Sequence, residues 1–113
     1  DVIITSYALV RRDINKLQEY NFRYVILDES QNIKNAMSQT AQAVKKLQSS
    51  HKLALSGTPI ENKLEELWSV FDFLMPGFLF NMAEFNSRYV NPIMERQDKT
   101  VEKYKFIRLF YAV

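Results

Sequence analysis

Short apolar runs that alternate with helix-like segments constrain the fold of this chain more than any other feature. Three runs are β-branched or aliphatic and end in polar residues: Val2–Thr5, Arg23–Asp28 and His51–Ser56. Apolar residues recur at helical spacing between them, over residues 6–20 and 36–48. Strands that alternate with helices favour a parallel sheet with helices on its faces. We therefore expect an α/β fold over residues 1–75, with the three runs as buried strands.

The predicted helices carry start and stop signals. The charged Arg11–Asp13 stretch is expected to divide the first helix, and Asn35 or Ser38 to cap the second. A third helix is expected between an Asn62–Glu65 capping box and Met75-Pro76-Gly77.

Residues 76–113 are predicted to be a helical C-terminal extension. Asn81 and Glu84 repeat the capping pattern, Pro92 is expected to end the helix that they open, and Asp98 to cap a last one.

Composition excludes several classes of site. The 113 residues contain no cysteine and a single histidine, His51, so disulfides, thiolate metal sites and histidine clusters are excluded. The net charge of +2 is too small to indicate nucleic acid by itself. No apolar run approaches the roughly 20 residues of a membrane span, so no membrane partner is expected. The start inside an apolar run, "DVIITSY", suggests a chain cut from something longer.

Polar residues follow each of the three predicted strands. They are Thr5-Ser6-Tyr7, Asp28-Glu29-Ser30-Gln31 and Ser56-Gly57-Thr58. In open parallel sheets, ligands bind beyond the carboxyl ends of the strands. We therefore expect these three groups to form one site.

The adjacent carboxylates Asp28 and Glu29 allow two interpretations. An Asp at the end of a buried strand can hold Mg²⁺ in a phosphate-hydrolysing site, while its neighbour orients or deprotonates a water. The alternative is a solvated strand end, where Asp and Ser favour a turn.

The other two groups also allow two interpretations each, and their spacing is a weaker signal than the acidic pair. The hydroxyls of Thr5-Ser6-Tyr7 can bind the phosphates of a nucleic acid backbone or satisfy local backbone groups. Ser56 and Thr58 can contact a phosphate or only line a strand-to-helix turn, in which Gly57 avoids an obstructing side chain. Lys34, with Arg11 and Arg12, forms either a modest basic surface or solvated helix faces.

Three stretches in this order resemble one family. "VIITSYALVRRD", "YVILDESQNIKN" and "LALSGTPIENKLEELWSVFDFLMPGFL" are similar to consecutive motifs of the SWI/SNF-type helicase-like ATPases of helicase superfamily two, and "FNSRYVNPI" continues the match. The resemblance covers residues 1 to about 93. It implies part of the first RecA-like (P-loop NTPase-type) lobe over residues 1–75, in a motor that uses ATP to translocate on double-stranded DNA.

The resemblance also implies roles for individual residues. Asp28 and Glu29 match the Walker B pair of motif II, for Mg²⁺ and water activation, and Gln31 would couple ATP to the moving lobe. Ser56, Gly57 and Thr58 match motif III, which links hydrolysis to DNA engagement. Thr5, Ser6 and Tyr7 match motif Ib, which touches the backbone of the tracked DNA strand, and Lys34 is a further candidate DNA contact.

The chain also departs from the family pattern. It has no Gly-x-x-x-x-Gly-Lys-Ser/Thr loop, since its only glycines are Gly57 and Gly77. The arginine finger of a second lobe is also absent, and residues 98–113 do not read like the family's usual continuation. We expect ATP and Mg²⁺ to serve the parent protein, with neither bound tightly nor hydrolysed by this chain alone.

Two other functions remain open. The chain could be a non-catalytic interaction module, derived from a degenerate lobe, that pairs with a partner or with itself. It could also be a small carboxylate-dependent nuclease, although a third metal carboxylate is lacking. The motor hypothesis predicts as partners double-stranded DNA, the P-loop half and the second lobe. The variant at Gln31 resembles bacterial members and suggests the cytoplasm, or the nucleus in a eukaryote.

Overall fold

The computed structural model describes residues 1–57 and 63–96, with side chains described up to Met94. The chain divides into two compact units, Asp1–Leu79 and Phe80–Val113. The first unit holds the sheet and three α-helices, and the second is helical over its described residues. No helix in the described part of the chain is long and apolar enough to cross a membrane.

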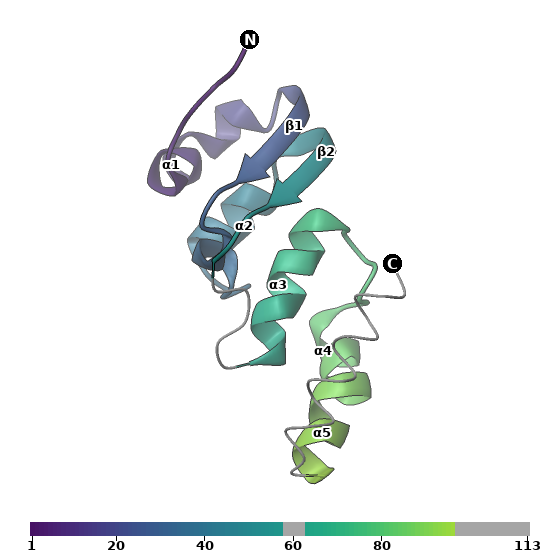
Figure 1. Ribbon diagram of the computed structural model, residues 1–113. Helices are drawn as coiled ribbons and strands as arrows, with labels where there is room; N and C mark the ends of the chain where they lie inside the picture. The colour runs from purple at the N-terminus through teal and green to yellow at the C-terminus, as the bar shows by residue number, and fades with distance from the viewer. Residues whose placement is uncertain (58–62, 97–113) are drawn as a thin grey trace. The chain divides into compact units, whose positions relative to one another are not determined.

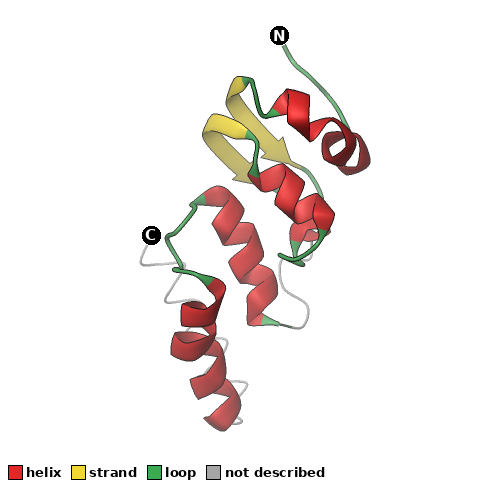
Figure 2. Cartoon of the chain, turned by 180° about the vertical axis from the view of Figure 1, so that it is seen from behind, coloured by secondary structure: helices red, strands yellow, loops and turns green. Residues whose placement is uncertain are grey.

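A parallel pair of strands organises the first unit. Strand β1 (Asn21–Leu27) and strand β2 (Gln48–Ala54) lie side by side and point the same way, in register from Asn21↔Gln48 to Leu27↔Ala54 (Figures 1 and 2). Backbone hydrogen bonds continue past the strand ends, because Leu55 N donates to the Leu27 carbonyl and Ser30 N donates to the Leu55 carbonyl, both at 2.8 Å. The prediction of a parallel sheet with flanking helices is confirmed.

The predicted first strand, Val2–Thr5, is wrong in this structure. Residues 1–6 form no strand, and Val2, Ile3 and Ile4 are 87%, 66% and 93% exposed. The described sheet contains only β1 and β2, and neither pairs with this segment. Without a neighbouring strand to accept its backbone hydrogen bonds, a β-branched run gains no ladder.

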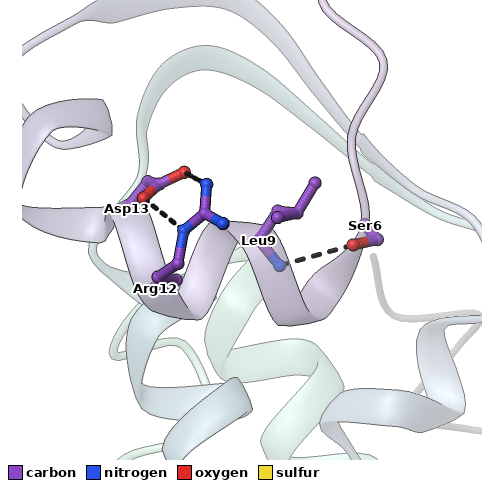
Figure 3. Close-up of polar contacts among 4 residues, drawn as sticks. All are labelled: Ser6, Leu9, Arg12 and Asp13. Atoms are coloured by element: carbon purple, nitrogen blue, oxygen red, sulfur yellow. Dashed lines mark hydrogen bonds and ion pairs between the residues drawn. The ribbon is translucent and has the colours of Figure 1, made fainter.

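Helix α1 (Tyr7–Leu17) is a single continuous helix, so the predicted break at Arg11–Asp13 is wrong. The side chain of Ser6 caps it by accepting a hydrogen bond from Leu9 N at 3.3 Å (Figure 3). Arg12 and Asp13 pair side by side on the exposed surface, with Nε–Oδ1 and Nη2–Oδ2 distances of 2.8 and 2.7 Å (Figure 3). The side chains of Arg12 and Asp13 therefore form hydrogen bonds with each other at the surface, and the backbone hydrogen bonds of the helix are not interrupted.

The other elements of this unit lie close to their predicted positions. A 3₁₀ turn, η1 (Ser30–Ile33), follows β1; helix α2 (Gln39–Lys45) is capped by Ser38, one of the two predicted caps; and helix α3 (Leu64–Leu74) ends at Met75. The residue that caps α3 is Lys63, without a side-chain cap bond, whereas the predicted cap Asn62 lies outside the described residues.

The core of the first unit lies on one face of the sheet. It gathers buried apolar residues of α1, α2, α3, η1 and the segment after α2 around the end of β1: Val10, Ile14, Leu27, Ile33, Ala41, Ala43, Val44, Leu47 and Phe73. On the strands, Tyr24, Ile26 and Leu53 remain about half exposed. One face of the sheet is therefore packed, and the other keeps an apolar surface in solvent.

Side-chain contacts fix α3 to the segment that follows β1. The fully buried Ser69 donates a 2.5 Å hydrogen bond to the carbonyl of Ile33, at the end of η1. Lys45 of α2 forms an ion pair with Asp72 of α3, with a distance of 3.1 Å between Nζ and Oδ2, and both side chains are mostly buried. These polar bonds add direction to an apolar contact, so α3 holds the 3₁₀ turn in place.

The second unit begins with a capped helix. Asn81 accepts a hydrogen bond from Glu84 N at 2.8 Å and caps α4 (Met82–Phe85), as predicted. A π-helical turn, η2 (Asn86–Val90), and α5 (Asn91–Arg96) follow without a gap. Pro92 therefore does not end the helix, which continues through α5; the proline lies directly after the π-helical turn η2, where the regular i→i−4 bonding is already interrupted. The helix predicted after Asp98 lies outside the described residues.

The buried bond of Ser69 gives a stability prediction. Ser69→Ala should lower the free energy of unfolding by about 1–3 kcal/mol, because the carbonyl of Ile33 loses a donor in a water-excluded place. Urea denaturation of the 113-residue chain measures this. Ser87→Ala, at an exposed helical serine, is the matched control and should change it by less than about 0.5 kcal/mol. Equal effects of the two substitutions would contradict the role of Ser69.

Candidate functional site

The acidic turn, residues Asp28–Gln31, lies directly beyond the buried end of β1. Because β1 and β2 are parallel and in register, the segment after β2, Leu55–Gly57, lies beside it. Ser30 is buried and its backbone is bonded to Leu55, which pins the middle of the turn to the neighbouring strand end. The structure thus brings together two of the three predicted polar groups through the sheet itself.

Glu29 has a left-handed backbone conformation, with φ 49° and ψ 54°. This conformation costs a residue with a Cβ roughly 1 kcal/mol or more, so local contacts must support it. Asp28 Oδ1 accepts a hydrogen bond from Glu29 N at 2.9 Å. The Glu29 carbonyl accepts from Asn32 N at 3.1 Å and from Asn32 Nδ2 at 2.8 Å. These bonds hold the peptide on both sides of Glu29.

Tyr7 joins the third predicted group to the acidic turn, although its own segment is not a strand. Its hydroxyl donates to the carbonyl of Asp28 at 2.6 Å and lies 3.4 Å from that of Glu29. Burial, then the charges of Asp28 and Glu29, raise the pKa of the Tyr7 phenol to about 12. The phenol therefore keeps its proton at neutral pH and acts as a donor.

A chain of side-chain hydrogen bonds connects the acidic turn to the segment after β2. Ser56 Oγ donates to Gln31 Oε1 at 2.8 Å, and Gln31 Nε2 donates to Glu29 Oε2 at 2.5 Å. This relay, Ser56–Gln31–Glu29, uses both ends of the glutamine amide and leaves Glu29 Oε1 without a hydrogen bond from any described residue. A movement of Ser56 would therefore reach the carboxylate of Glu29.

The remaining predicted residues are placed differently. Ser6 is occupied as the cap of α1, and Lys34 forms an ion pair with Glu66, with a 3.6 Å N–O distance. A Cβ on Gly57 would meet no atom within 4 Å, so the expected obstruction at this position is wrong. Thr5 is exposed, and Thr58 lies outside the described residues. The DNA-binding and coupling roles of these residues stay predictions.

Asn32 was not among the predicted site residues, although it makes two of the bonds that hold Glu29. Its signal in the sequence is weak, since an Asn shortly after a strand end indicates only a turn. The left-handed conformation of Glu29 has no sequence signal of its own.

Carboxylates suited to a cation are few at this site. No group of three or more His, Cys, Asp or Glu side chains able to hold a metal occurs among residues 1–57 and 63–96. Asp28 is exposed, and one of its carboxylate oxygens is engaged by Glu29 N. Among the described residues, this site therefore offers the carboxylate of Asp28, which is oriented by the bond from Glu29 N, and the neighbouring carboxylate of Glu29.

The sequence as a whole matches the family model of the SNF2-related domain over residues 1–108. The chain belongs to the SNF2-related domain family. It is 51% identical over 98 residues to the TATA-binding protein-associated factor BTAF1 of Arabidopsis thaliana, and 46% identical over 99 residues to the putative ATP-dependent helicase/translocase YwqA of Bacillus subtilis. These matches cover 87% and 88% of this chain but 5% and 11% of those proteins. The chain therefore spans a small part of its curated SNF2 relatives.

A solved structure shows the same fold. The SWI2/SNF2 ATPase core of Sulfolobus solfataricus in complex with double-stranded DNA is 44% identical, with a TM-score of 0.80, over 95% of this chain and 23% of that chain. The expected partial RecA-like fold of an SNF2 ATPase core is thereby confirmed, and so is the resemblance to SWI/SNF-type ATPases.

The raised pKa of Tyr7 predicts a pH dependence of stability. Below about pH 10 the phenol is protonated in both the folded and the unfolded chain. Between about pH 10 and 12 the unfolded chain loses this proton while the folded chain keeps it. The free energy of unfolding should therefore fall as the pH rises through this window.

Tyr7→Phe should remove this contribution, and urea denaturation at pH 9 and pH 11.5 measures it. Tyr20→Phe, at a tyrosine that is 62% exposed, is the control and should retain the fall. An identical pH dependence in both variants would show that the Tyr7 hydroxyl is not held in the folded chain.

Proposed function

We propose that this chain is part of the first RecA-like lobe of a DNA-dependent ATPase of the SWI/SNF type, which translocates on double-stranded DNA. The observation that carries the proposal is the relay from Ser56 through Gln31 to Glu29, because it joins two strand ends at the carboxylates. Membership of the SNF2-related domain family, and relatives named as ATP-dependent helicases, support it.

The acidic turn fits the hydrolysis of a nucleoside triphosphate with Mg²⁺. The donors are hard carboxylate oxygens, which Mg²⁺ prefers, and Asp28 is exposed at the strand end where such an ion is held. Asp28 would be its ligand in the parent protein, and the ion would supply charge neutralisation on the phosphates. Glu29 would take the proton of the attacking water at Oε1, while Gln31 fixes Oε2.

The relay gives hydrolysis a connection to the rest of the motor. Ser56, Gly57 and the neighbouring Thr58 would respond to engagement of DNA, and Gln31 would transmit the change to Glu29. Thr5, Ser6 and Lys34 would contact the DNA backbone, and Lys34 would have to exchange its pairing with Glu66 for a phosphate. The structural neighbour determined with double-stranded DNA supports this partner.

The 113 residues supply only part of an ATP site. No Gly-x-x-x-x-Gly-Lys-Ser/Thr loop occurs in them, so the backbone cradle for the phosphates must come from another part of the parent protein. The P-loop half and a second lobe are therefore the proposed intramolecular partners.

A second function rests on the exposed apolar face formed by Tyr24, Ile26 and Leu53. A chain that presents such a face can act as a non-catalytic interaction module, or associate with itself. Light scattering after size exclusion tests this alternative, and a monomer at high concentration would count against it.

The proposed role of Glu29 predicts a large catalytic effect. In the full-length parent protein, Glu29→Gln should lower DNA-stimulated ATP hydrolysis by about 10²–10⁴-fold, because a general base is lost. ATP binding should be retained. Glu19→Gln, at an exposed position on another turn, is the matched control. A rate within a few-fold of the unsubstituted protein would exclude Glu29 as the base.

The incomplete phosphate site predicts weak nucleotide binding by the 113-residue chain itself. Its melting temperature should not change when millimolar Mg-ATP is added, because the phosphate cradle is absent. Differential scanning fluorimetry measures this. A rise of several degrees that disappears in Asp28→Asn would contradict the expectation, because it would show a complete site within these residues.

A further inference from the structure

Tyr7 makes a contact that neither hydrolysis nor DNA binding explains by itself. It is the first residue of α1, and its hydroxyl reaches across 21 and 22 positions of sequence to the carbonyls of Asp28 and Glu29, at 2.6 and 3.4 Å. The phenol at the start of this helix thus donates hydrogen bonds to the backbone carbonyls of the two residues whose side chains are the proposed catalytic carboxylates.

The turn needs a donor at this place. Glu29 is held in a left-handed conformation, and the direction of its side chain depends on the orientation of the two peptides that flank it. Asn32 supports the Glu29 carbonyl from the following turn. At the Asp28 carbonyl, the donor among the described residues is Tyr7. Without it, this peptide would be held only through its N–H, by the local bond from Glu29 N to Asp28 Oδ1.

Tyr7 is itself held by well-packed neighbours. Its partly buried ring packs against the apolar core, to which α1 contributes the buried residues Val10 and Ile14. The cap by Ser6 fixes the first turn of the helix. The phenol retains its proton at neutral pH, as described above, so it remains a donor. The hydroxyl is therefore placed by a rigid element and not by a flexible loop.

We propose that Tyr7 is a positioning residue, which holds the Asp28–Glu29 peptides in the conformation that aims Glu29 and thereby ties the start of α1 to the catalytic turn. This inference rests on the proposed ATPase function. It also gives the segment Thr5–Ser6 a direct route to the carboxylates, because Tyr7 is the next residue. Contact of DNA with this segment would then bias the acidic turn through one side chain.

The test compares Tyr7→Phe with the unsubstituted full-length parent protein, in steady-state ATP hydrolysis with saturating DNA. The loss of one hydrogen bond made to the aligned turn should lower kcat by roughly three- to tenfold. KM for ATP and the DNA concentration that gives half-maximal stimulation should each stay within about twofold. Tyr20→Phe, at a tyrosine that is 62% exposed, is the matched control and should leave all three parameters unchanged.

A replacement that restores a donor separates positioning from packing. 4-Aminophenylalanine at position 7 keeps a ring with an N–H group at the para position, so it should recover most of kcat, whereas Phe does not. If Tyr7→Phe folds poorly, the comparison of this variant with the unsubstituted protein still decides the question. If the 4-aminophenylalanine variant has a normal melting temperature but a kcat as low as that of a misfolded protein, the proposal is overturned.

Other outcomes are equally decisive. Unchanged kcat in a folded Tyr7→Phe protein would overturn the positioning role while leaving the ATPase function intact. An increase in the DNA concentration for half-maximal stimulation, with kcat unchanged, would assign Tyr7 to DNA contact instead. No ATP hydrolysis by the unsubstituted full-length protein would refute the proposed function, and with it this inference.

Discussion

The parallel pairing of β1 and β2 is the interaction on which the rest of the first unit depends. Its register continues past the strands through the bonds of Leu55 to Leu27 and of Ser30 to Leu55. This continuation sets the acidic turn beside Ser56, and the relay through Gln31 becomes geometrically available. A shift of one residue in the register would turn every side chain to the opposite face and separate these groups.

The acidic turn combines a strained backbone at Glu29 with hydrogen bonds from several other residues. Glu29 in the left-handed region is stabilised by bonds from Asn32, by the side chain of Asp28 and by the neighbouring phenol of Tyr7. Ser69 and α3 hold the 3₁₀ turn that follows. Strain that is supported from several elements is typical of sites where a side chain must point in one direction. The carboxylates are therefore held by α1, by the sheet and by α3 together.

Local patterns predicted α3, most of β1 and the positions of Asp28 and Glu29. They predicted β2 only in part, because the strand begins at Gln48 and not at His51. They failed where the outcome depends on distant partners. Val2–Thr5 has a strong β propensity, but no described strand pairs with it. Pro92 was expected to end a helix, but it lies directly after a π-helical turn and the helix continues. The bonds from Tyr7 to Asp28 and from Ser69 to Ile33 join residues 21 and 36 positions apart, which no local pattern encodes.

The central claim is that the relay links the two strand ends energetically. A double-mutant cycle of Gln31→Ala and Ser56→Ala, measured by urea denaturation of the 113-residue chain, tests it most directly, because the cycle isolates the pair from the other contacts of each residue. The account predicts a coupling energy of about 0.5–1.5 kcal/mol, as expected for a partly buried side-chain hydrogen bond. Strict additivity of the two substitutions would contradict the link between the acidic turn and the segment after β2.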